Sequence, residues 1–306
     1  MMKQNKNLLF IVFFAISFLV ANFTGFSQTA GKTGLSFLKI GAGARNIALG
    51  GNGNVLAQDV TSVFYNPANL KNKNNNELFI SHNEWIQDVR SELIAAKFEL
   101  FGLQMGLGVN STSVSGIEVR RIPGDAEAEV KATYFAAGLS AAFNVSRNIN
   151  AGVTVKYLYE SLFADEATGL GFDLGVNYRE GNLLVAAAVN DIGSMNELRK
   201  ESTKLPTKIS IGASYFYPLT EQNLELNGGL EGLKYLATDD IHLNFGLECI
   251  YDKTFALRLG YQTMYESKNI TAGAGVYYKG LKFDYAFSPF SLNLGSGHTF
   301  SLGFEF

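Results

Sequence analysis

Cysteine and proline are both scarce in this sequence. Cys249 is the single cysteine, and the 306 residues include 5 prolines against 32 glycines. One cysteine excludes an internal disulfide, so the chain has to be stabilised by packing and by backbone hydrogen bonds. Proline cannot donate to a strand ladder, and its scarcity favours a chain built mostly of strands.

Long apolar runs are absent beyond the start of the chain. There, Lys3 and Lys6 precede an apolar stretch over residues 8–20, which small and polar residues follow. This pattern predicts a secretory signal peptide over residues 1–27, cleaved near Ser27. A retained anchor helix is the alternative, but the stretch is shorter than the ~20 apolar residues of a spanning helix. An exported chain with no other long apolar segment is either soluble or a β-barrel of the outer membrane.

From residue 77 onward, the chain is a series of segments in which apolar and polar residues alternate. Alternation with period 2 predicts strands, and spanning strands of tilted barrels need ~9–11 residues. An even number is usual for single-chain bacterial barrels, although a merger of 280–288 with a neighbour would give twelve instead of fourteen. The predicted strands are 77–85, 89–100, 103–119, 132–145, 149–162, 168–179, 182–191, 205–217, 223–234, 240–251, 254–265, 269–279, 280–288 and 298–306.

The last predicted strand alternates up to its final residue. Phe300, Leu302, Phe304 and Phe306 share one face, and the residues between them are small or polar. A strand that is apolar on one face and polar on the other fits a transmembrane barrel, with the apolar face toward lipid. We expect Phe304 and Phe306 to act as the signal for barrel assembly.

Charged residues occupy the middle of several predicted strands, on the face opposite the apolar one. Asp173, Glu248 and Arg258 are three of them. A Lys or Arg on the lipid face near the bilayer midplane costs about 2–4 kcal/mol, so these charges are expected to face the lumen and to pair across it. A soluble antiparallel sandwich is the alternative, but it does not explain so many strands with so few prolines.

Aromatic residues gather toward the strand ends, as in the interfacial girdles of membrane barrels. The β-propensity of tyrosine alone is the other explanation. The expected girdle comprises Trp85, Tyr157, Tyr159, Tyr215, Tyr217, Tyr251, Tyr261, Tyr265, Tyr277 and Tyr278.

Three connections are longer than the others, at residues 121–131, 193–204 and 289–297. With fourteen strands both termini are periplasmic, and the first two of these loops are extracellular. The acidic run at 125–129 is expected to be a solvated loop and not a cation site.

Residues 28–76 lack the pattern of spanning strands and are rich in glycine. A short helix is expected from Asp59 to Phe64, with Asp59 as its cap and Asn66-Pro67 after it. A compact glycine-rich block before the first strand suits a hatch, a plug inside the lumen of a barrel formed by residues 77–306. A periplasmic or disordered leader is the alternative.

Signals for catalysis, metal and nucleic acid are weak. A formal net charge of -3 gives no sign of a nucleic-acid partner. Ser301 faces the interior by alternation, which argues against a lipid hydrolase, and the glycine pairs complete no dinucleotide fingerprint. We expect no enzyme, no metal and no cofactor. The three histidines, which lack neighbours at ligand spacing, are His82, His242 and His298.

Two motifs before the first strand carry a resemblance to a known family. GAGARNIALGG at 41–51 and DVTSVFYNPANL at 59–70 resemble the N-terminal signature of the PorV/PorQ outer-membrane proteins, which are distantly similar to the FadL long-chain fatty acid channels. The segments at 81–90 and 157–175 also look like that family. The resemblance implies a FadL-like barrel of 14 strands with an N-terminal hatch. Its hatch motif residues would be Gly41, Gly43, Arg45, Asn66, Pro67 and Ala68.

The resemblance also implies a function in type IX secretion or surface attachment. Such a protein would bind exported cargo or a partner of the secretion machinery, with outer-membrane lipid around it. A FadL-like channel for hydrophobic small molecules is the alternative, and a purely structural membrane protein is a third. The channel would need an apolar pocket between hatch and wall, and the same side chains could instead hold the hatch in place. The candidates for that pocket are Leu35, Phe37, Leu38 and Phe64.

Overall fold

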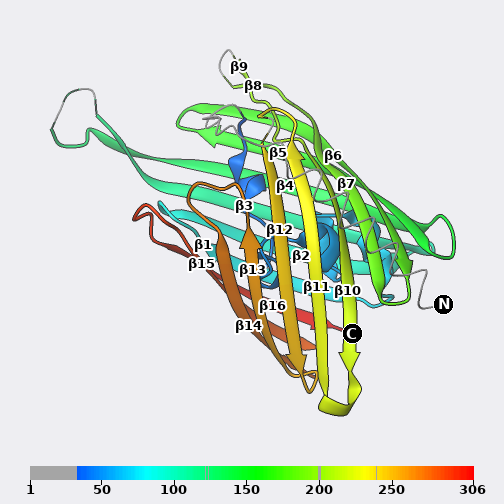
Figure 1. Ribbon diagram of the computed structural model, residues 1–306. Helices are drawn as coiled ribbons and strands as arrows, with labels where there is room; N and C mark the ends of the chain where they lie inside the picture. Colours follow the sequence, from blue (N-terminus) through cyan, green and yellow to red (C-terminus); the bar gives the residue numbers. More distant parts are fainter. Residues whose placement is uncertain (1–32, 121, 123, 199–200, 239) are drawn as a thin grey trace. The chain divides into compact units, whose positions relative to one another are not determined.

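The computed structural model describes residues 33–306 except 121, 123, 199, 200 and 239. The predicted signal peptide, residues 1–27, lies outside the described residues. Fourteen antiparallel strands form one closed barrel, in which β1 pairs with both β2 and β16 (Figure 1). The predicted fold class and the strand count of fourteen are therefore confirmed.

The strand bounds follow the alternating segments of the sequence closely. The barrel strands are β1 (Glu77–Glu84), β2 (Val89–Leu100), β3 (Leu103–Val119), β4 (Ala128–Asn144), β5 (Ile149–Leu162), β6 (Asp165–Glu180), β7 (Leu183–Met195), β10 (Lys208–Leu219), β11 (Leu224–Tyr235), β12 (Ile241–Tyr251), β13 (Phe255–Gln262), β14 (Ile270–Tyr278), β15 (Leu281–Pro289) and β16 (Ser296–Glu305). A small separate hairpin, β8 (Glu197–Leu198) and β9 (Glu201–Ser202), lies in the β7–β10 connection.

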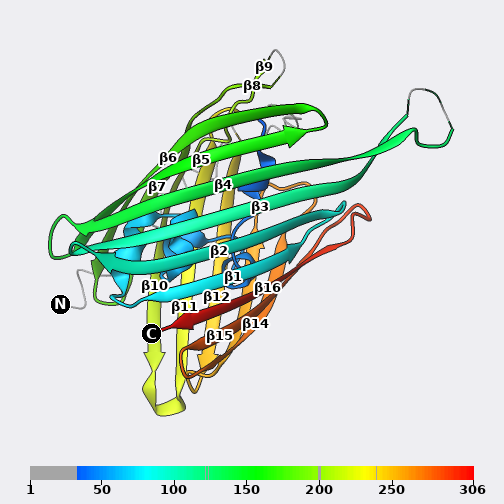
Figure 2. The ribbon, with the colours of Figure 1, turned by 180° about the vertical axis from the view of Figure 1, so that it is seen from behind.

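The two ends of the barrel differ in their connections. At the end that contains the start of β1 and Phe306, the connections between consecutive strands are short turns; we call it the terminal end. At the opposite end, the loop end, the β3–β4 hairpin projects well beyond its neighbours (Figures 1 and 2). The acidic run at 125–129 was expected to be a loop throughout. β4 starts at Ala128, however, so the end of this run belongs to the strand, and Glu129 pairs with Glu118 of β3. Outer-membrane barrels place short turns at the periplasm, so we expect the loop end to be the extracellular one.

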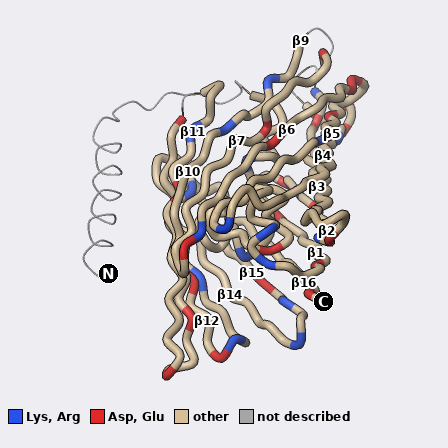
Figure 3. Tube along the Cα trace, turned by 90° about the vertical axis from the view of Figure 1, so that its right-hand side faces the viewer, with Lys and Arg blue, Asp and Glu red and all other residues tan. Residues whose placement is uncertain are grey.

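Apolar side chains cover the outside of the barrel. Phe245 and Phe304 each expose 42% of their surface and Leu257 exposes 68%, whereas Glu248 exposes 1% and Arg258 2%. Figure 3 shows charged residues at turns of the chain and long uncharged stretches along the strands. The alternative of a soluble sandwich is excluded, since its apolar face would be buried.

The girdle prediction is only partly right. Tyr157, Tyr215, Tyr251 and Tyr278 are among its exposed members. Tyr277 instead points inward, where Arg258 donates a hydrogen bond to its hydroxyl; adjacent residues of a strand face opposite sides, so Tyr277 and Tyr278 cannot both face lipid. Tyr265 lies beyond the end of β13 and stacks on His242 with ring centroids 3.7 Å apart.

Short helices fill the lumen between opposite walls of the barrel. They are η1 (Ser36–Lys39), α2 (Ala44–Ala48), α3 (Gly53–Leu56), η2 (Val60–Phe64) and η3 (Pro67–Asn72). α2 contacts β13 to β16, α3 contacts β7, β10 and β11, and η3 contacts β3 to β6 (blue and light blue in Figure 1). No helix in the described part of the chain is long and apolar enough to cross a membrane. We call residues 33–76 the hatch.

A charge on the outer face of β12 should destabilise the barrel according to its depth. Leu247 and Tyr251 share this face and are 53% and 54% exposed. We expect Leu247→Arg, in the middle of the strand, to lower the free energy of unfolding by about 2–4 kcal/mol, and Tyr251→Arg, at the terminal end, by about 0–1 kcal/mol. Denaturant unfolding in phospholipid vesicles measures both. Equal losses for the two variants would contradict the orientation of this face.

Deletion of Phe306 should impair assembly. The residue closes the seam between the first and last strands through two backbone hydrogen bonds with Asn76, of 3.2 and 3.0 Å, and its ring stacks on Phe304 with centroids 5.5 Å apart. We expect less folded, heat-modifiable barrel in the outer membrane than for Phe306→Tyr, the control. A normal amount of folded barrel after the deletion would refute this role.

Candidate functional site

The first hatch motif, residues 41–51, turns the chain so that the Arg45 side chain reaches the inner wall of the barrel. Gly41 and Gly43 have φ of 98° and 82°, in the region that favours glycine. Between them, the Ala42 amide donates to the Tyr65 hydroxyl at 2.7 Å, and that hydroxyl donates to the Ala42 carbonyl at 3.1 Å. The turn therefore leads directly into α2, and the second motif fixes it.

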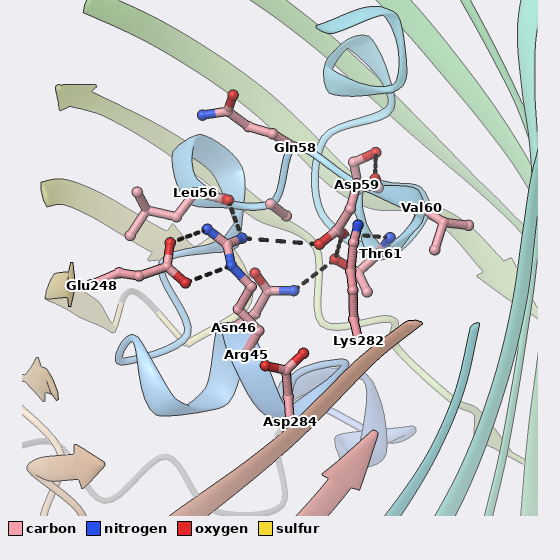
Figure 4. A network of polar contacts seen from close by, with 12 residues as sticks. Arg45, Asn46, Leu56, Gln58, Asp59, Val60, Thr61, Glu248, Lys282 and Asp284 are labelled. Atoms are coloured by element: carbon pink, nitrogen blue, oxygen red, sulfur yellow. Dashed lines mark hydrogen bonds and ion pairs between the residues drawn. The ribbon is translucent and has the colours of Figure 1, made fainter. Parts of the chain in front are cut away.

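Arg45 binds the barrel through Glu248 of β12. Its Nε and Nη2 donate to the two carboxylate oxygens at 2.9 and 2.6 Å, and its Nη1 donates to the Leu56 carbonyl at 2.7 Å (Figure 4). Arg258 of β13 donates to the same carboxylate at 2.7 Å and lies 2.9 Å from Asp284. Glu248 therefore lies between two guanidinium groups, one from the hatch and one from the wall. This bidentate geometry is the strongest form of ion pair available to arginine.

A second tie joins the hatch to the seam of the barrel. Lys282 lies 2.7 Å from Glu77 and 2.8 Å from Glu305, and Glu77 accepts a hydrogen bond from the Val60 amide at 2.9 Å. Asp59 caps η2 by accepting from the Thr61 amide at 2.9 Å. Burial raises the pKa of Asp59, but the charges of Arg45 and Lys282 outweigh burial and hold this pKa below its usual value. The carboxylate is therefore charged at neutral pH.

The NPA motif docks the hatch on the other wall. The side-chain oxygen of Asn66 accepts from the Ala68 amide at 3.0 Å, and Pro67 stands at the first position of η3. The Asn66 amide group donates to Asn54 at 2.8 Å and to the carbonyls of Val176 and Ala187, both at 3.3 Å.

Glycine in the wall allows this close approach. A Cβ on Gly152 of β5 would lie 2.5 Å from both the Pro67 carbonyl carbon and the Ala68 nitrogen, so a side chain there would displace the motif. Four of the hatch motif residues thus contact the barrel wall, namely Arg45, Asn66, Pro67 and Ala68. Gly41 and Gly43 shape the turn that precedes α2.

The inward charges pair along the wall and not across the lumen as expected. Glu248 and Arg258 are direct neighbours on β12 and β13. Asp173 lies 2.8 Å from Lys156, which also lies 2.6 Å from Asp191. The reason is that the hatch fills the interior, so a charge finds its partner on the next strand or on the hatch.

A pocket lies above the hatch, toward the loop end. It has an empty volume of ≈ 880 Å³, part of which is open to solvent, and Phe37, Leu38 and Phe64 line it. Leu35 does not line it and packs in a core with Leu158, Met195 and Leu205. Sequence reasoning missed the lysines of this pocket, because three of them lie on the hatch, at a strand end or in a connection. The pocket lysines are Lys39, Lys156, Lys208 and Lys268.

The other candidates for chemistry have separate contacts. Ser301 donates to the Ser81 hydroxyl at 2.9 Å and accepts from the Ala44 amide at 2.8 Å, which makes it part of the hatch docking. His298 pairs with the Tyr285 hydroxyl at 2.9 Å. Within the described residues, no group of three His, Cys, Asp or Glu side chains is placed to hold a metal ion.

Comparison with protein families gives one match that covers most of the chain. The family described as "Type IX secretion system membrane protein PorP/SprF" matches residues 61–304. No curated protein matches the sequence. The matched family therefore differs from PorV/PorQ, which the motifs resemble, but is associated with the same secretion system.

Solved structures share the fold at low sequence identity. The toluene transporter TbuX of Ralstonia pickettii matches with a TM-score of 0.58 and 13% identity, over 87% of this chain and 97% of that one. TodX, a toluene transporter of Pseudomonas putida, matches with a TM-score of 0.58 and 12% identity, over 87% and 98%. A FadL homologue of Pseudomonas aeruginosa matches with a TM-score of 0.51 and 11% identity, over 87% and 98%. The fold is thus FadL-like and that of an outer-membrane protein, and these matches are to secretion proteins and transporters, not to enzymes.

Loss of the Arg45 side chain should release the hatch. We expect Arg45→Ala to lower the free energy of unfolding by about 3–5 kcal/mol, since breaking a buried pair leaves an incompletely compensated charge. Protease sensitivity of the hatch and conductance in planar bilayers should both rise. The matched control is Arg120→Ala, an exposed arginine on the β3–β4 hairpin. Equal stability and conductance of the two variants would show that the pair does not hold the hatch.

Proposed function

Because the chain belongs to the PorP/SprF family of type IX secretion system membrane proteins, we propose that it serves protein secretion or surface attachment by binding an exported protein or a partner protein at the loop end. The observation that carries this proposal is the contrast between the two parts of the structure. The buried Arg45–Glu248 ion pair and hydrogen bonds to the barrel wall fix the hatch in the lumen, whereas a strand hairpin projects from the extracellular end (Figure 2). This arrangement favours a rigid scaffold for a partner over a pore for a protein.

The projecting β3–β4 hairpin offers free strand edges. The pairing of β2 with β3 ends at Val114, and that of β4 with β5 ends at Ala132. Beyond these residues, β3 and β4 pair only with each other, up to Val119 and Ala128. Exposed backbone edges can accept an added strand from another protein. Ile122 at the tip is 73% exposed and adds an apolar contact.

Uptake of a small molecule is the second candidate function. The pocket behind the outer loops, with Phe37, Leu38 and Phe64 in its lining, favours it. The fixed hatch disfavours passage through the lumen, because a ligand would have to break the Arg45–Glu248 pair or pass around it. Partner binding therefore remains the first proposal.

Shortening the hairpin tests partner binding. In the test variant, Asn-Gly replaces residues 115–131, which leaves Val114 and Ala132 joined by a two-residue turn. In the matched control, Asn-Gly replaces residues 220–223 between Leu219 and Leu224 at the terminal end. We expect crosslinking and pull-down from native membranes to recover secretion-machinery components or exported proteins with the wild type and the control, but not with the test variant.

Two outcomes would contradict the proposal. Equal recovery with the test variant would remove the hairpin from the binding surface. Recovery of no protein by the wild type, with a small molecule copurifying instead, would favour uptake. Heat modifiability of all three proteins shows whether each barrel is folded.

A further inference from the structure

The projecting part of the β3–β4 hairpin, residues 115–131, reverses the polarity of the wall from which it extends (Figure 2). In the part of β4 that pairs with β5, Leu139 faces outward and is 50% exposed, whereas Ser140 faces the lumen and is fully buried. Alternate residues of a strand share a side, so Glu129 continues the side of Leu139 and Val130 continues the side of Ser140. The side that is apolar along the lipid-facing wall is therefore charged in the projecting part, and the lumen side is apolar there.

The apolar side of the projecting part consists of two strands only. Ile117 of β3 lies opposite Val130 of β4, and Val119 lies opposite Ala128. All four side chains remain at least partly exposed. A hairpin of two strands is marginally stable in water, and an apolar face usually needs three or more strands to be stable on its own. A third strand from a partner would complete this face.

β4 offers the regular edge for such a strand. Gly116, with φ of 74°, lies in the bulge of β3, and a bulge interrupts the ladder along that edge. The pairing of β4 with β5 ends where Ala132 lies opposite Leu162, and from there up to Ala128 the edge of β4 is open. Phe163 follows directly in the turn after β5. Its ring is 68% exposed and is available to the end of an added strand.

The other side of the projecting part carries the charges that select the added strand. Glu118 and Glu129 lie directly opposite each other, and like charges in this arrangement are destabilising. Arg120 pairs with Glu118, whereas neither Glu129 nor Lys131 forms an ion pair with any described residue. Glu129 and Lys131 are two residues apart and share one side of β4. An added strand that offers a base to Glu129 and an acid to Lys131 would satisfy both.

A second copy of this chain fits the edge of β4 poorly. Two copies in one membrane have the same orientation, so their β4 strands would meet about a two-fold axis along the membrane normal. That rotation turns the sheet over, and the apolar side of one hairpin would continue into the charged side of the other. A strand of a different protein is free of this constraint.

We propose that a strand of an exported or partner protein adds antiparallel to the edge of β4, with an acidic residue beside Lys131, an apolar residue opposite Val130 and a Lys or Arg opposite Glu129. The added strand takes the place of β5, which is antiparallel to β4. Read from its N-terminus, the bound segment therefore has the order acid, apolar, base. This inference rests on the partner binding proposed above and names the chemistry of the segment that is bound.

The test uses the purified full-length barrel in an uncharged detergent and two fluorescein-labelled peptides of identical composition. The complementary probe is Thr-Val-Glu-Val-Lys-Val-Thr, and the exchanged probe, Thr-Val-Lys-Val-Glu-Val-Thr, differs only in the order of its two charges. A third peptide, Thr-Val-Glu-Pro-Lys-Val-Thr, keeps the charges of the complementary probe, but its proline cannot donate to a ladder.

Fluorescence anisotropy measures the affinity of each peptide for four proteins. They are the wild type, the double variant Glu129→Lys/Lys131→Glu, the variant in which Asn-Gly replaces residues 115–131, and the control in which Asn-Gly replaces residues 220–223. The double variant exchanges the two charges of the edge and leaves the net charge of the protein unchanged.

We expect the wild type to bind the complementary probe about tenfold more tightly than the exchanged probe, because two cross-strand charge pairs change from attractive to repulsive. The double variant should reverse this preference by about the same factor. The proline peptide should bind weakly to every protein, and the variant that lacks residues 115–131 should bind no probe well. The control at residues 220–223 should bind as the wild type does.

Three results would overturn the inference. The first is equal affinity of the wild type for the two probes, or a preference for the exchanged one. The second is the same preference in the wild type and the double variant. The third is a dimer of the wild type, detected by size-exclusion chromatography with light scattering, that the variant lacking residues 115–131 does not form, because a second copy would then occupy the edge.

This inference and the proposed function can fail separately. If the probes bind as expected but the wild type recovers no protein from native membranes, only the proposed function is contradicted. If the wild type and the double variant recover the same protein equally, and the two probes bind equally, only the inference about the added strand is contradicted.

Discussion

The charged inner wall of the barrel is the constraint on which the rest of the structure depends. With lipid outside, a charge in the middle of a spanning strand has to face inward, and an enclosed charge is stabilised when it is paired. Glu248 obtains one partner from the neighbouring strand and one from the hatch. Glu77 of β1 likewise has one partner on the wall, Lys282 of β15, and one on the hatch, the Val60 amide, from which it accepts a hydrogen bond. The hatch is therefore part of what allows this wall to carry charges, and neither is complete alone.

The strands could be predicted from the sequence because a single rule, period-2 alternation, fixes both their existence and their orientation. The rule places Glu248 and Arg258 inside and Phe245 outside, as the structure does. It fails where its premise ends. The acidic run at 125–129 resembles a loop in composition, yet part of it belongs to β4 because β3 continues to pair with it. Residue type alone likewise fails to predict orientation. Tyr277 and Tyr278 are both tyrosines, but as neighbours in one strand they face opposite sides of the wall.

The candidate sites could be predicted only in part. Arg45 and the NPA motif stand out as motifs, but their partners lie far along the chain, and nothing local in the sequence links Arg45 to Glu248 or Asn66 to Val176. The pocket lysines carry no motif. Lys268 lies outside every alternating segment of the sequence, so no periodic pattern predicts that it lines the same pocket as Lys208.

The wall beside the pocket shows how a local irregularity is closed. The pairing of β6 with β7 shifts register between Phe172 and Leu174, which would leave a backbone amide without a partner. Instead Asp173 accepts from the Asp191 amide at 2.8 Å, and Lys156 binds both carboxylates. Thr207 then donates to the Asp191 carbonyl at 2.7 Å. Lys156 of β5 therefore holds β6 and β7 together where their pairing is interrupted, so paired charges replace the missing backbone contacts of the wall at this point.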